Sequence, residues 1–229
     1  VTGKIHQIGH GSSGMTKAQV VQTKKDLPDF TVNIVRYNHI SWIRLNPMRP
    51  PFDNWKVRWA VQLALDRGAW LEFSKAGDVA MADPAYYLHA DSPWAIKAAE
   101  FQKFPGFRQD KKDEDIKEAN RLLDEVFGAG NRPKDLTFAV WTLLSRREPG
   151  LWAIDQFATH LNWQFVTKMV EQAEYGRIGN ECTYTAMSDA APVHNMVYSP
   201  DPSDAFVGAH TVTGAAKPKC FIRGYNEYK

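Results

Sequence analysis

The chain has 229 residues, of which 44% are hydrophobic and 24% are charged, and its formal net charge is +2. These values are ordinary for a soluble globular protein and leave room for one large domain or two small ones. The small net charge argues against a nucleic-acid-binding protein, which concentrates basic residues on one face. No apolar run approaches the roughly 18 residues that a membrane-spanning helix needs. The sequence leaves open whether its two cysteines, Cys182 and Cys220, pair or stay as thiols.

A glycine-rich stretch follows the first predicted strand, GKIHQI. Gly9, Gly11 and Gly14 spell G-x-G-x-x-G, the pattern of a dinucleotide-binding turn. The strand before it carries Lys4 and His6 and reads as half exposed, whereas the first strand of such a site is buried on both faces. The next predicted strand ends without the acidic residue that would hold a ribose. We therefore interpret the stretch as a plain loop and keep an NADP-dependent enzyme as the alternative function.

The next segments predict a helix, an extended region and a second helix. TKAQVVQTKKD reads as a short helix with Thr16 as its N-cap. FTVNIVRYNHISWIRLN is rich in β-branched and aromatic residues and predicts one long strand or a hairpin. The clearest helix follows Pro50 and Pro51, and Asp53 is its expected cap. Its apolar residues have the spacing of a helix that packs on a core: Val57, Ala60, Val61, Ala64 and Leu65.

The second half of the chain alternates between helices and strands. Residues 76–110 show weak periodicity and predict a long, partly ordered loop region. A second strong helix is expected at about 113–127, with acidic residues in its first turn and Gly128 at its end. Then come strand LTFAVW, helix GLWAIDQFATHL, strand WQFVTKMVE, short helix AEYGRIG and strand TYTAMS, and residues 189–229 are loop-rich. This alternation predicts an α/β domain built on one sheet.

The sequence shows no constellation for covalent or metal catalysis. GHGSSG is not G-x-S-x-G, so the nucleophile elbow of a hydrolase is absent. The seven histidines form no H-x-x-x-H pair and have no cysteine at metal-ligand spacing. The acidic run DKKDEDIKE is typical of a solvated helix start. We therefore expect no catalysis, no metal and no cofactor.

The stretch WIRLNPMRPPFDNWKVRWAVQLALDRGAW, from Trp42 to Trp70, resembles a segment of the family 5 (peptide/nickel-type) extracellular solute-binding proteins of ABC importers. That family carries a strand ending in Asn, a Pro-Pro-Phe-Asp run and a Val-Arg-x-Ala helix ending in Asp-Arg. The matching residues are Asn46, Pro50, Pro51, Phe52, Asp53, Asn54, Val57, Arg58, Ala60, Asp66 and Arg67. Looser matches follow in the family's order: DEDIKEANRLLDEVFGAG, in which Asn120 replaces the common Lys, IDQFATHLNWQFVTKMVEQAEYGRI, SPDPSDAF and RGYNEYK.

The resemblance implies an α/β fold, namely one lobe of a two-lobe periplasmic-binding-protein type II fold with a mixed central sheet flanked by helices. Residues 1–229 are then one solute-binding lobe whose partner lobe is absent. The implied function is capture of an oligopeptide or similar small solute for import, without catalysis, and a carbohydrate is the alternative ligand. The implied partners are the solute, the second lobe and an ABC permease, with no nucleic acid. We expect a periplasmic or extracellular monomer, associated with the membrane through the transporter, whose single lobe binds ligand poorly because enclosure is missing.

The resemblance also implies a ligand site around the strand LTFAVW. In peptide-binding relatives an Arg in the following loop can hold the ligand carboxylate, and here the loop WTLLSRREP offers Arg146 or Arg147. Arg suits this role because its guanidinium pairs with a carboxylate through two parallel hydrogen bonds. A pair of surface arginines is the alternative. Trp141, at the end of the strand, is the expected aromatic wall of the site, with a core position as its alternative.

A second group of site residues is expected near the segment SPDPSDAF. Relatives place an Asp about three residues before the Asp-Pro, where it meets the ligand's ammonium, but here Tyr198 takes that place. Tyr198 suits a sugar or another neutral group as well, and Asp189 is the expected source of charge from a neighbouring turn. Ser188, His194 and Asn195 are assigned to the loop that faces the cleft. Nickel binding occurs in the family, but no set of residues here requires it.

Overall fold

A mixed four-stranded sheet forms the centre of the molecule, in a computed structural model that describes residues 17–29, 31, 39–70, 72 and 96–192. Its strand order is β1-β4-β2-β3. β4 pairs antiparallel with β1 and parallel with β2, and β2 pairs parallel with β3. The strands are β1 (His39–Leu45), β2 (Thr137–Trp141), β3 (Val166–Val170) and β4 (Ala186–Pro192). The mixed sheet confirms the predicted fold class.

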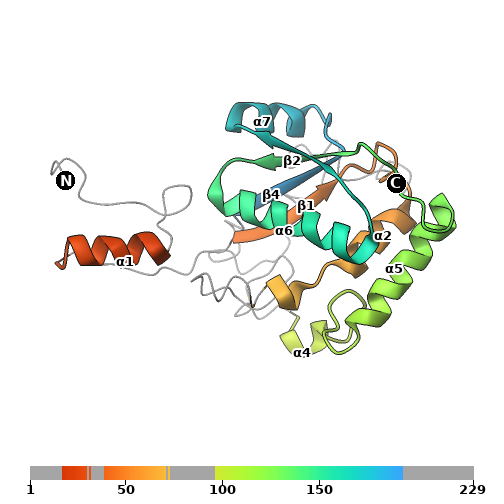
Figure 1. Cartoon of the computed structure of the whole chain (residues 1–229), viewed down its shortest axis with the longest axis horizontal. Helices are drawn as coiled ribbons and strands as arrows, with labels where there is room; N and C mark the ends of the chain where they lie inside the picture. The colour runs from red at the N-terminus through yellow and green to blue at the C-terminus, as the bar shows by residue number, and fades with distance from the viewer. Residues whose placement is uncertain (1–16, 30, 32–38, 71, 73–95, 193–229) are drawn as a thin grey trace.

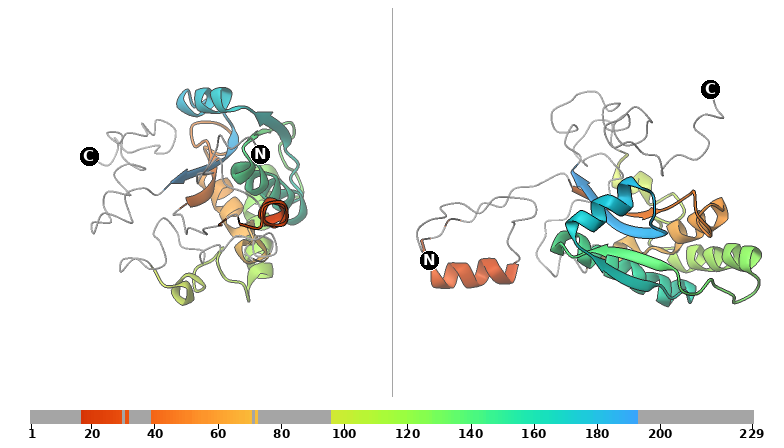
Figure 2. Two further views of the ribbon diagram at one scale, coloured as in Figure 1. Left: turned by 90° about the vertical axis from the view of Figure 1, so that its left-hand side faces the viewer. Right: turned by 90° about the horizontal axis from the view of Figure 1, so that it is seen from above.

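Helices cover both faces of this sheet (Figure 1). The larger hydrophobic core lies on one face and is closed by α2 (Trp55–Ala64), α5 (Lys112–Phe127) and α6 (Leu144–Leu161). α7 (Gln172–Asn180) covers the other face, where a smaller cluster is buried. Figure 1 and the right-hand view of Figure 2 show that α1 (Lys17–Asp26) lies apart from the sheet. The short α4 (Ala98–Phe101) precedes α5.

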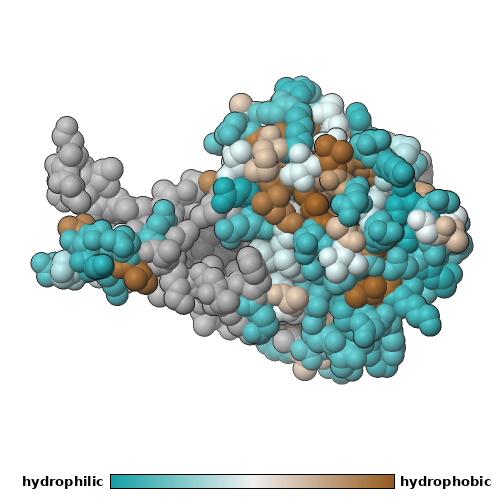
Figure 3. All heavy atoms as spheres, viewed as in Figure 1, coloured by the Kyte–Doolittle hydropathy of each residue, from teal (hydrophilic) through white to brown (hydrophobic). Residues whose placement is uncertain are grey.

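The predicted helices were largely confirmed, including the apolar stripe of α2, whose members Val57, Ala60, Val61, Ala64 and Leu65 are all buried. α5 ends where Gly128 adopts a φ of +86°, as its sequence predicts. Hydrophilic side chains cover the outer surface of this helix (Figure 3), among them Arg121, which pairs with Glu118 and Glu125. No helix in the described part of the chain has both the length and the apolar character that crossing a membrane requires.

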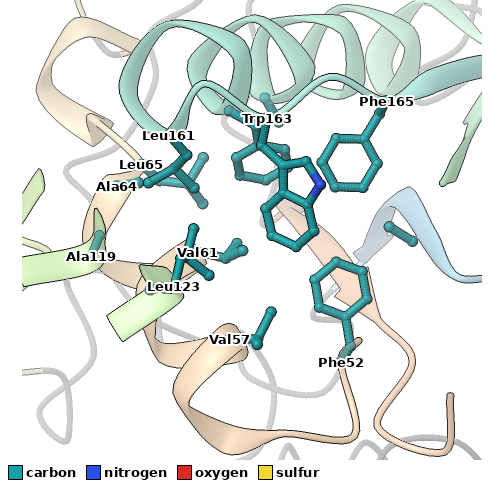
Figure 4. Close-up of a cluster of buried hydrophobic side chains, with 14 of the residues drawn as sticks. Phe52, Val57, Val61, Ala64, Leu65, Ala119, Leu123, Leu161, Trp163 and Phe165 are labelled. Carbon is teal, nitrogen blue, oxygen red and sulfur yellow. The ribbon is translucent and has the colours of Figure 1, made fainter. Parts of the chain in front are cut away.

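Aromatic rings form the middle of the larger core (Figure 4). Trp163 is fully buried, and its ring centroid lies 5.8 Å from that of Phe52 and 5.0 Å from that of Phe165. Its indole Nε1 donates a hydrogen bond of 2.9 Å to the carbonyl of Pro133, so the polar atom is satisfied inside the core. Burial of side chains this large supplies much of the driving force for folding.

The segment Asn46 to Asn54 closes the end of the sheet at which β1 ends and the other three strands begin, which we call the base. Asn46 is fully buried, and its Nδ2 donates to the carbonyls of Cys182 and Tyr184 while its Oδ1 accepts from Met48 N. The Pro50–Pro51 peptide bond is cis. The Asn that ends the strand is therefore a structural residue that joins two loops.

The prediction that Asp53 caps α2 was wrong. Asn54 is the N-cap: it has extended backbone angles, and its Oδ1 accepts a hydrogen bond of 2.9 Å from Lys56 N. Asp53 instead belongs to the preceding turn, because its N–H donates to the carbonyl of Arg49. Both residue types cap helices well, so the sequence alone could not separate two neighbours.

Two predicted boundaries in the second half of the chain were also wrong. α6 begins at Leu144 rather than near Gly150, and it runs through Pro149. An interior proline lacks the N–H that bonds to the preceding turn and crowds a carbonyl there, yet α6 continues past it to Leu161. β4 extends to Pro192, so residues 189–192 are strand rather than loop, because β1 offers paired positions as far as His39. A proline is tolerated at the end of a strand.

Candidate functional site: the carboxyl edge of the sheet

The opposite end of the sheet from the base is where β2 and β3 end, and we call it the carboxyl edge. In open α/β sheets, ligands bind outside the carboxyl ends of the strands. Two hydrogen bonds of 3.0 Å join the ends of β2 and β3 here. Thr142 N donates to the carbonyl of Val170, and Thr142 Oγ1 donates to Glu171 Oε2. The first residues after the two strands are therefore held together.

Trp141 lies at this edge and stacks on Tyr175 of α7. The ring centroids are 4.5 Å apart and the ring planes differ by 25°. Both side chains are half-buried, so Trp141 packs against a helix and also keeps part of its surface exposed. Trp141 is therefore a packed residue that is also partly exposed, and its role as the wall of a site stays a prediction. Tyr175 was not among the predicted site residues, because its contact with Trp141 joins two separate elements.

Arg146 and Arg147 lie in the first turn of α6, and the prediction of a loop at this position was wrong. The backbone N–H of Arg147 donates to the carbonyl of Leu143, and its side chain is exposed. The N-cap residue of α6, Leu143, makes no side-chain capping bond, and the first turn of the helix contains no acidic residue. The first turn of a helix carries backbone donors and a positive partial charge, so this end of α6 favours an anion.

Ser188 and Asp189 lie in β4, whereas Ser188 was predicted in a loop and Asp189 in a turn. Ser188 is 1% exposed and packs against Gly150 of α6. A Cβ on Gly150 would lie 2.7 Å from Ser188 Cβ and 2.9 Å from its Oγ, so helix and strand touch there. Within the described residues the Ser188 hydroxyl has no hydrogen-bond partner. Asp189 pairs with Trp42 in the ladder between β1 and β4.

The remaining candidates lie outside the described residues. These are the predicted ligand contacts His194, Asn195 and Tyr198, and the glycines on which the NADP alternative rests, Gly9, Gly11 and Gly14. Cys182 takes part in a disulfide bond, and the one other cysteine of the sequence, Cys220, also lies outside those residues. Across 17–29, 39–70 and 96–192, no group of three or more His, Cys, Asp or Glu side chains is arranged to hold a metal ion.

The charges of α7 and of the residue just before it fall into two groups. On α7, Arg177 donates to both Glu174 and Glu181, and the hydrogen bonds from Arg177 lower the pKa of the Glu174 carboxyl. Lys168 approaches the same carboxylate of Glu174 at 3.5 Å. Glu171 stands outside this network, since no described cation lies within ion-pair distance of it. Its carboxylate has the Thr142 hydroxyl as a partner instead.

A hollow at the base was not predicted from the sequence. It is a groove of about 930 Å³ between the start of α2 and the end of α5. Lys56 and Glu125 form an ion pair at the groove, and Trp55 beside them is 60% exposed. The groove lies near the beginnings of the strands, so it is separate from the carboxyl edge.

Comparison with known proteins shows similarity in structure and not in sequence. No family model and no curated protein matches the chain. The chain is similar to Haemophilus influenzae OppA in complex with RPPGFSPFR, with 18% identity, a TM-score of 0.65, and coverage of 90% of this chain and 38% of OppA. It is also similar to Helicobacter pylori DppA in complex with peptide STSA, with 16% identity, a TM-score of 0.57, and coverage of 82% of this chain and 32% of DppA. For MoaA from A. tumefaciens in complex with mannopinic acid, the identity is 14%, the TM-score is 0.58, and the coverage is 86% of this chain and 37% of MoaA.

These likenesses show the fold. The chain has the α/β fold of one lobe of a periplasmic solute-binding protein, as the resemblance of Trp42 to Trp70 predicts. It spans 38% of the length of OppA and similar shares of the other two proteins. The three proteins were solved with two peptides and with mannopinic acid.

Proposed function

We propose that this chain is a ligand-binding lobe of a solute-binding protein, which captures an oligopeptide or similar small solute for an ABC importer and performs no catalysis. The observation that carries the proposal is the structural likeness to peptide-binding proteins over 90% of the chain. Fold alone does not fix function, so the carboxyl edge supplies the second argument. It exposes a half-buried Trp and an uncapped helix start beside the ends of two parallel strands.

In this proposal the first turn of α6 receives the carboxylate of the solute. Arg147 is exposed there, and Arg146 lies in the same turn. A guanidinium beside free helix donors is a strong carboxylate site. Peptides and the mannopinic acid bound by MoaA both carry an acid group, so a carboxylate site would suit either kind of ligand. Trp141 serves as the aromatic wall, and Asp189, His194, Asn195 and Tyr198 are further proposed contacts, but Ser188 is left out because it is buried.

We further propose that a second lobe closes over this edge by a hinge motion. The chain spans 38% of the length of OppA, and a small ligand needs most of its surface buried to bind tightly. The single lobe should therefore bind weakly. The same proposal places the protein in the periplasm or outside the cell, as a monomer that delivers its solute to a permease.

The test uses backbone amide NMR of the chain with two probes, trialanine and trialanine amide, which lacks the carboxylate. We expect weak binding of trialanine, with shifts at Thr142 and at the first turn of α6. Arg147→Ala should weaken trialanine binding several-fold and leave the amide unaffected. Arg177→Ala, which removes an exposed arginine of α7, is the matched control and should change neither.

Three results would contradict the proposal in different ways. Equal binding of trialanine and its amide would show that the first turn of α6 is not a carboxylate site. Submicromolar binding by this chain alone would remove the need for a second lobe. A thermal shift with NADP, with no response to peptides, would favour the nucleotide-dependent enzyme. Mass spectrometry of the natively purified protein would identify any solute that stays bound, and a bound sugar would replace the peptide as the ligand.

A further inference from the structure

A second charged group at the carboxyl edge has the chemistry of a cation site. We propose that Glu171, held by Thr142 and flanked by the stacked pair Trp141 and Tyr175, receives an ammonium or guanidinium group of the solute. This inference rests on the proposed function and narrows its ligand class to solutes that carry a positive charge, such as peptides with a basic side chain.

The position of the Glu171 side chain is the first argument. Glu171 is the N-cap residue of α7, and its side chain makes no capping hydrogen bond with that helix. Its Oε2 instead accepts a hydrogen bond of 3.0 Å from Thr142 Oγ1, across the junction between β3 and β2. An acid at a helix start ordinarily satisfies the free N–H groups there. Here the carboxylate is directed to the end of the neighbouring strand.

The second argument is that the carboxylate keeps its charge available. No described cation pairs with Glu171, whereas the nearby Glu174 and Glu181 both pair with Arg177. The residue is exposed, and a single hydroxyl occupies one of its two oxygens. An ionised carboxylate accepts several hydrogen bonds. A ligand ammonium or guanidinium can therefore bind it without breaking an internal ion pair.

The third argument is the aromatic pair beside the carboxylate. Trp141 directly precedes Thr142, and Tyr175 lies one helical turn beyond Glu171, with its N–H bonded to the Glu171 carbonyl. The two rings stack at 4.5 Å, and they are carried by the residue before Thr142 and by the residue one helical turn after Glu171. Aromatic faces attract cations, and Trp does so best. A carboxylate beside aromatic rings suits a cation better than a neutral sugar hydroxyl.

The cation site and the proposed carboxylate site are of opposite sign. Arg147 lies at the start of α6, after β2, and Glu171 lies at the start of α7, after β3. The two starts are joined by the hydrogen bonds of Thr142. A solute with an acid group and a basic group would meet both. This arrangement also orients the solute, because the reversed pose places like charges together.

The experiment compares the peptides Ala-Lys-Ala and Ala-norleucine-Ala, which differ only in the side-chain ammonium, by amide NMR titration of the chain. Glu171→Gln keeps the shape and removes the charge. We expect this variant to bind Ala-Lys-Ala about fivefold more weakly, which is the upper range for an ion pair open to water. Its affinity for Ala-norleucine-Ala should change less than twofold. Glu181→Gln, an exposed acid at the end of the same helix, is the matched control and should change neither.

Thr142 supplies a test of positioning that charge alone would not explain. Thr142→Val removes the hydroxyl that holds the carboxylate and should weaken Ala-Lys-Ala two- to threefold, while Thr142→Ser should restore wild-type binding. Unchanged amide spectra outside the edge will show that each variant is folded.

Each outcome decides between the two proposals. If Glu171→Gln weakens both peptides equally, their common amino terminus occupies the site, and the cation site is supported. If both peptides bind and Glu171→Gln affects neither, or if Glu181→Gln has the same effect, the cation site is wrong and the solute-binding function stands. If neither peptide shifts any amide of the carboxyl edge, both proposals fall.

Discussion

The base and the carboxyl edge of the sheet are built in opposite ways. At the base, Asn46 and Trp163 are fully buried, and their polar atoms bond to backbone carbonyls of distant segments. At the carboxyl edge, Trp141 and Tyr175 are half-buried and Glu171 is exposed. Beneath its surface groove the base is packed and these side chains are internally satisfied, whereas the carboxyl edge keeps polar groups open to solvent.

This difference explains why the fold was easier to infer than the site. The motif that resembles solute-binding proteins, from Trp42 to Trp70, turns at the base, where its prolines and Asn46 organise packing. Packing constrains residue type strongly, so a motif at the base can indicate the fold although the chain as a whole is only 18% identical to OppA. Residues at the open edge are free to differ with the ligand. A base motif therefore reports architecture and leaves the solute undefined.

The largest expected effect tests whether the base is the stabilising end. Trp163→Ala should lower the free energy of unfolding by about 3–5 kcal/mol, because it leaves a cavity among Phe52, Phe165 and the α2 stripe. Urea denaturation followed by circular dichroism measures this. Trp163→Phe keeps most of the volume and removes the hydrogen bond to Pro133, so about 2 kcal/mol is expected. If Trp163→Ala lowers the free energy of unfolding by less than about 1 kcal/mol, the base is not the stabilising end of the sheet.

An intermediate effect is expected where α6 meets β4. Gly150→Ala places a Cβ 2.7 Å from Ser188 Cβ, and overpacking should outweigh the better helix propensity of Ala, for a net loss of about 1–2 kcal/mol. Gly176→Ala on α7 is the matched control. Nothing lies within 4 Å of the added Cβ, so this variant should gain up to about 1 kcal/mol. Chemical denaturation measures the free energy of unfolding of both variants. If both substitutions change it in the same direction, the close contact between Gly150 and Ser188 is contradicted.

The smallest effect concerns the cap at the base. Asn54→Ala should lower the free energy of unfolding by about 1 kcal/mol, because Lys56 N loses its side-chain acceptor. Asp53→Ala keeps the cap of α2 and should cost less stability than Asn54→Ala, because Asp53 is exposed and interactions between exposed groups contribute little. Thermal unfolding of the two variants sharpens the comparison, and a larger loss for Asp53→Ala would restore the cap predicted from the sequence.

Periodic elements were predictable because their signal is local. The stripe of α2 and the Gly128 end of α5 are visible within one or two helical turns of sequence. The start of α6 was not, because Pro149 reads as a break while the helix passes through it. The strand character of Asp189 was missed for a related reason: its pairing partner, Trp42, lies far back in the chain.

The site was less predictable than the fold because its contacts join separate elements. Arg146, Arg147 and Trp141 were predicted as site residues through the family resemblance, which supplies a position and no geometry. The pair of Thr142 and Glu171 spans 29 positions and leaves no local pattern. The same holds for the stack of Trp141 on Tyr175. Only the folded sheet, by aligning the ends of β2 and β3, brings these side chains together.

The contact between Gly150 and Ser188 has a consequence for how ligand recognition evolves. Because α6 rests on β4 at that point with no spare room, the height of the helix above the sheet is set by two small, hidden residues. Arg147 lies about one helical turn before Gly150 on α6. Enlarging either small residue should shift the arginine relative to the strand ends. If Arg147 holds the solute as proposed, a change in this buried pair would alter recognition without touching the surface.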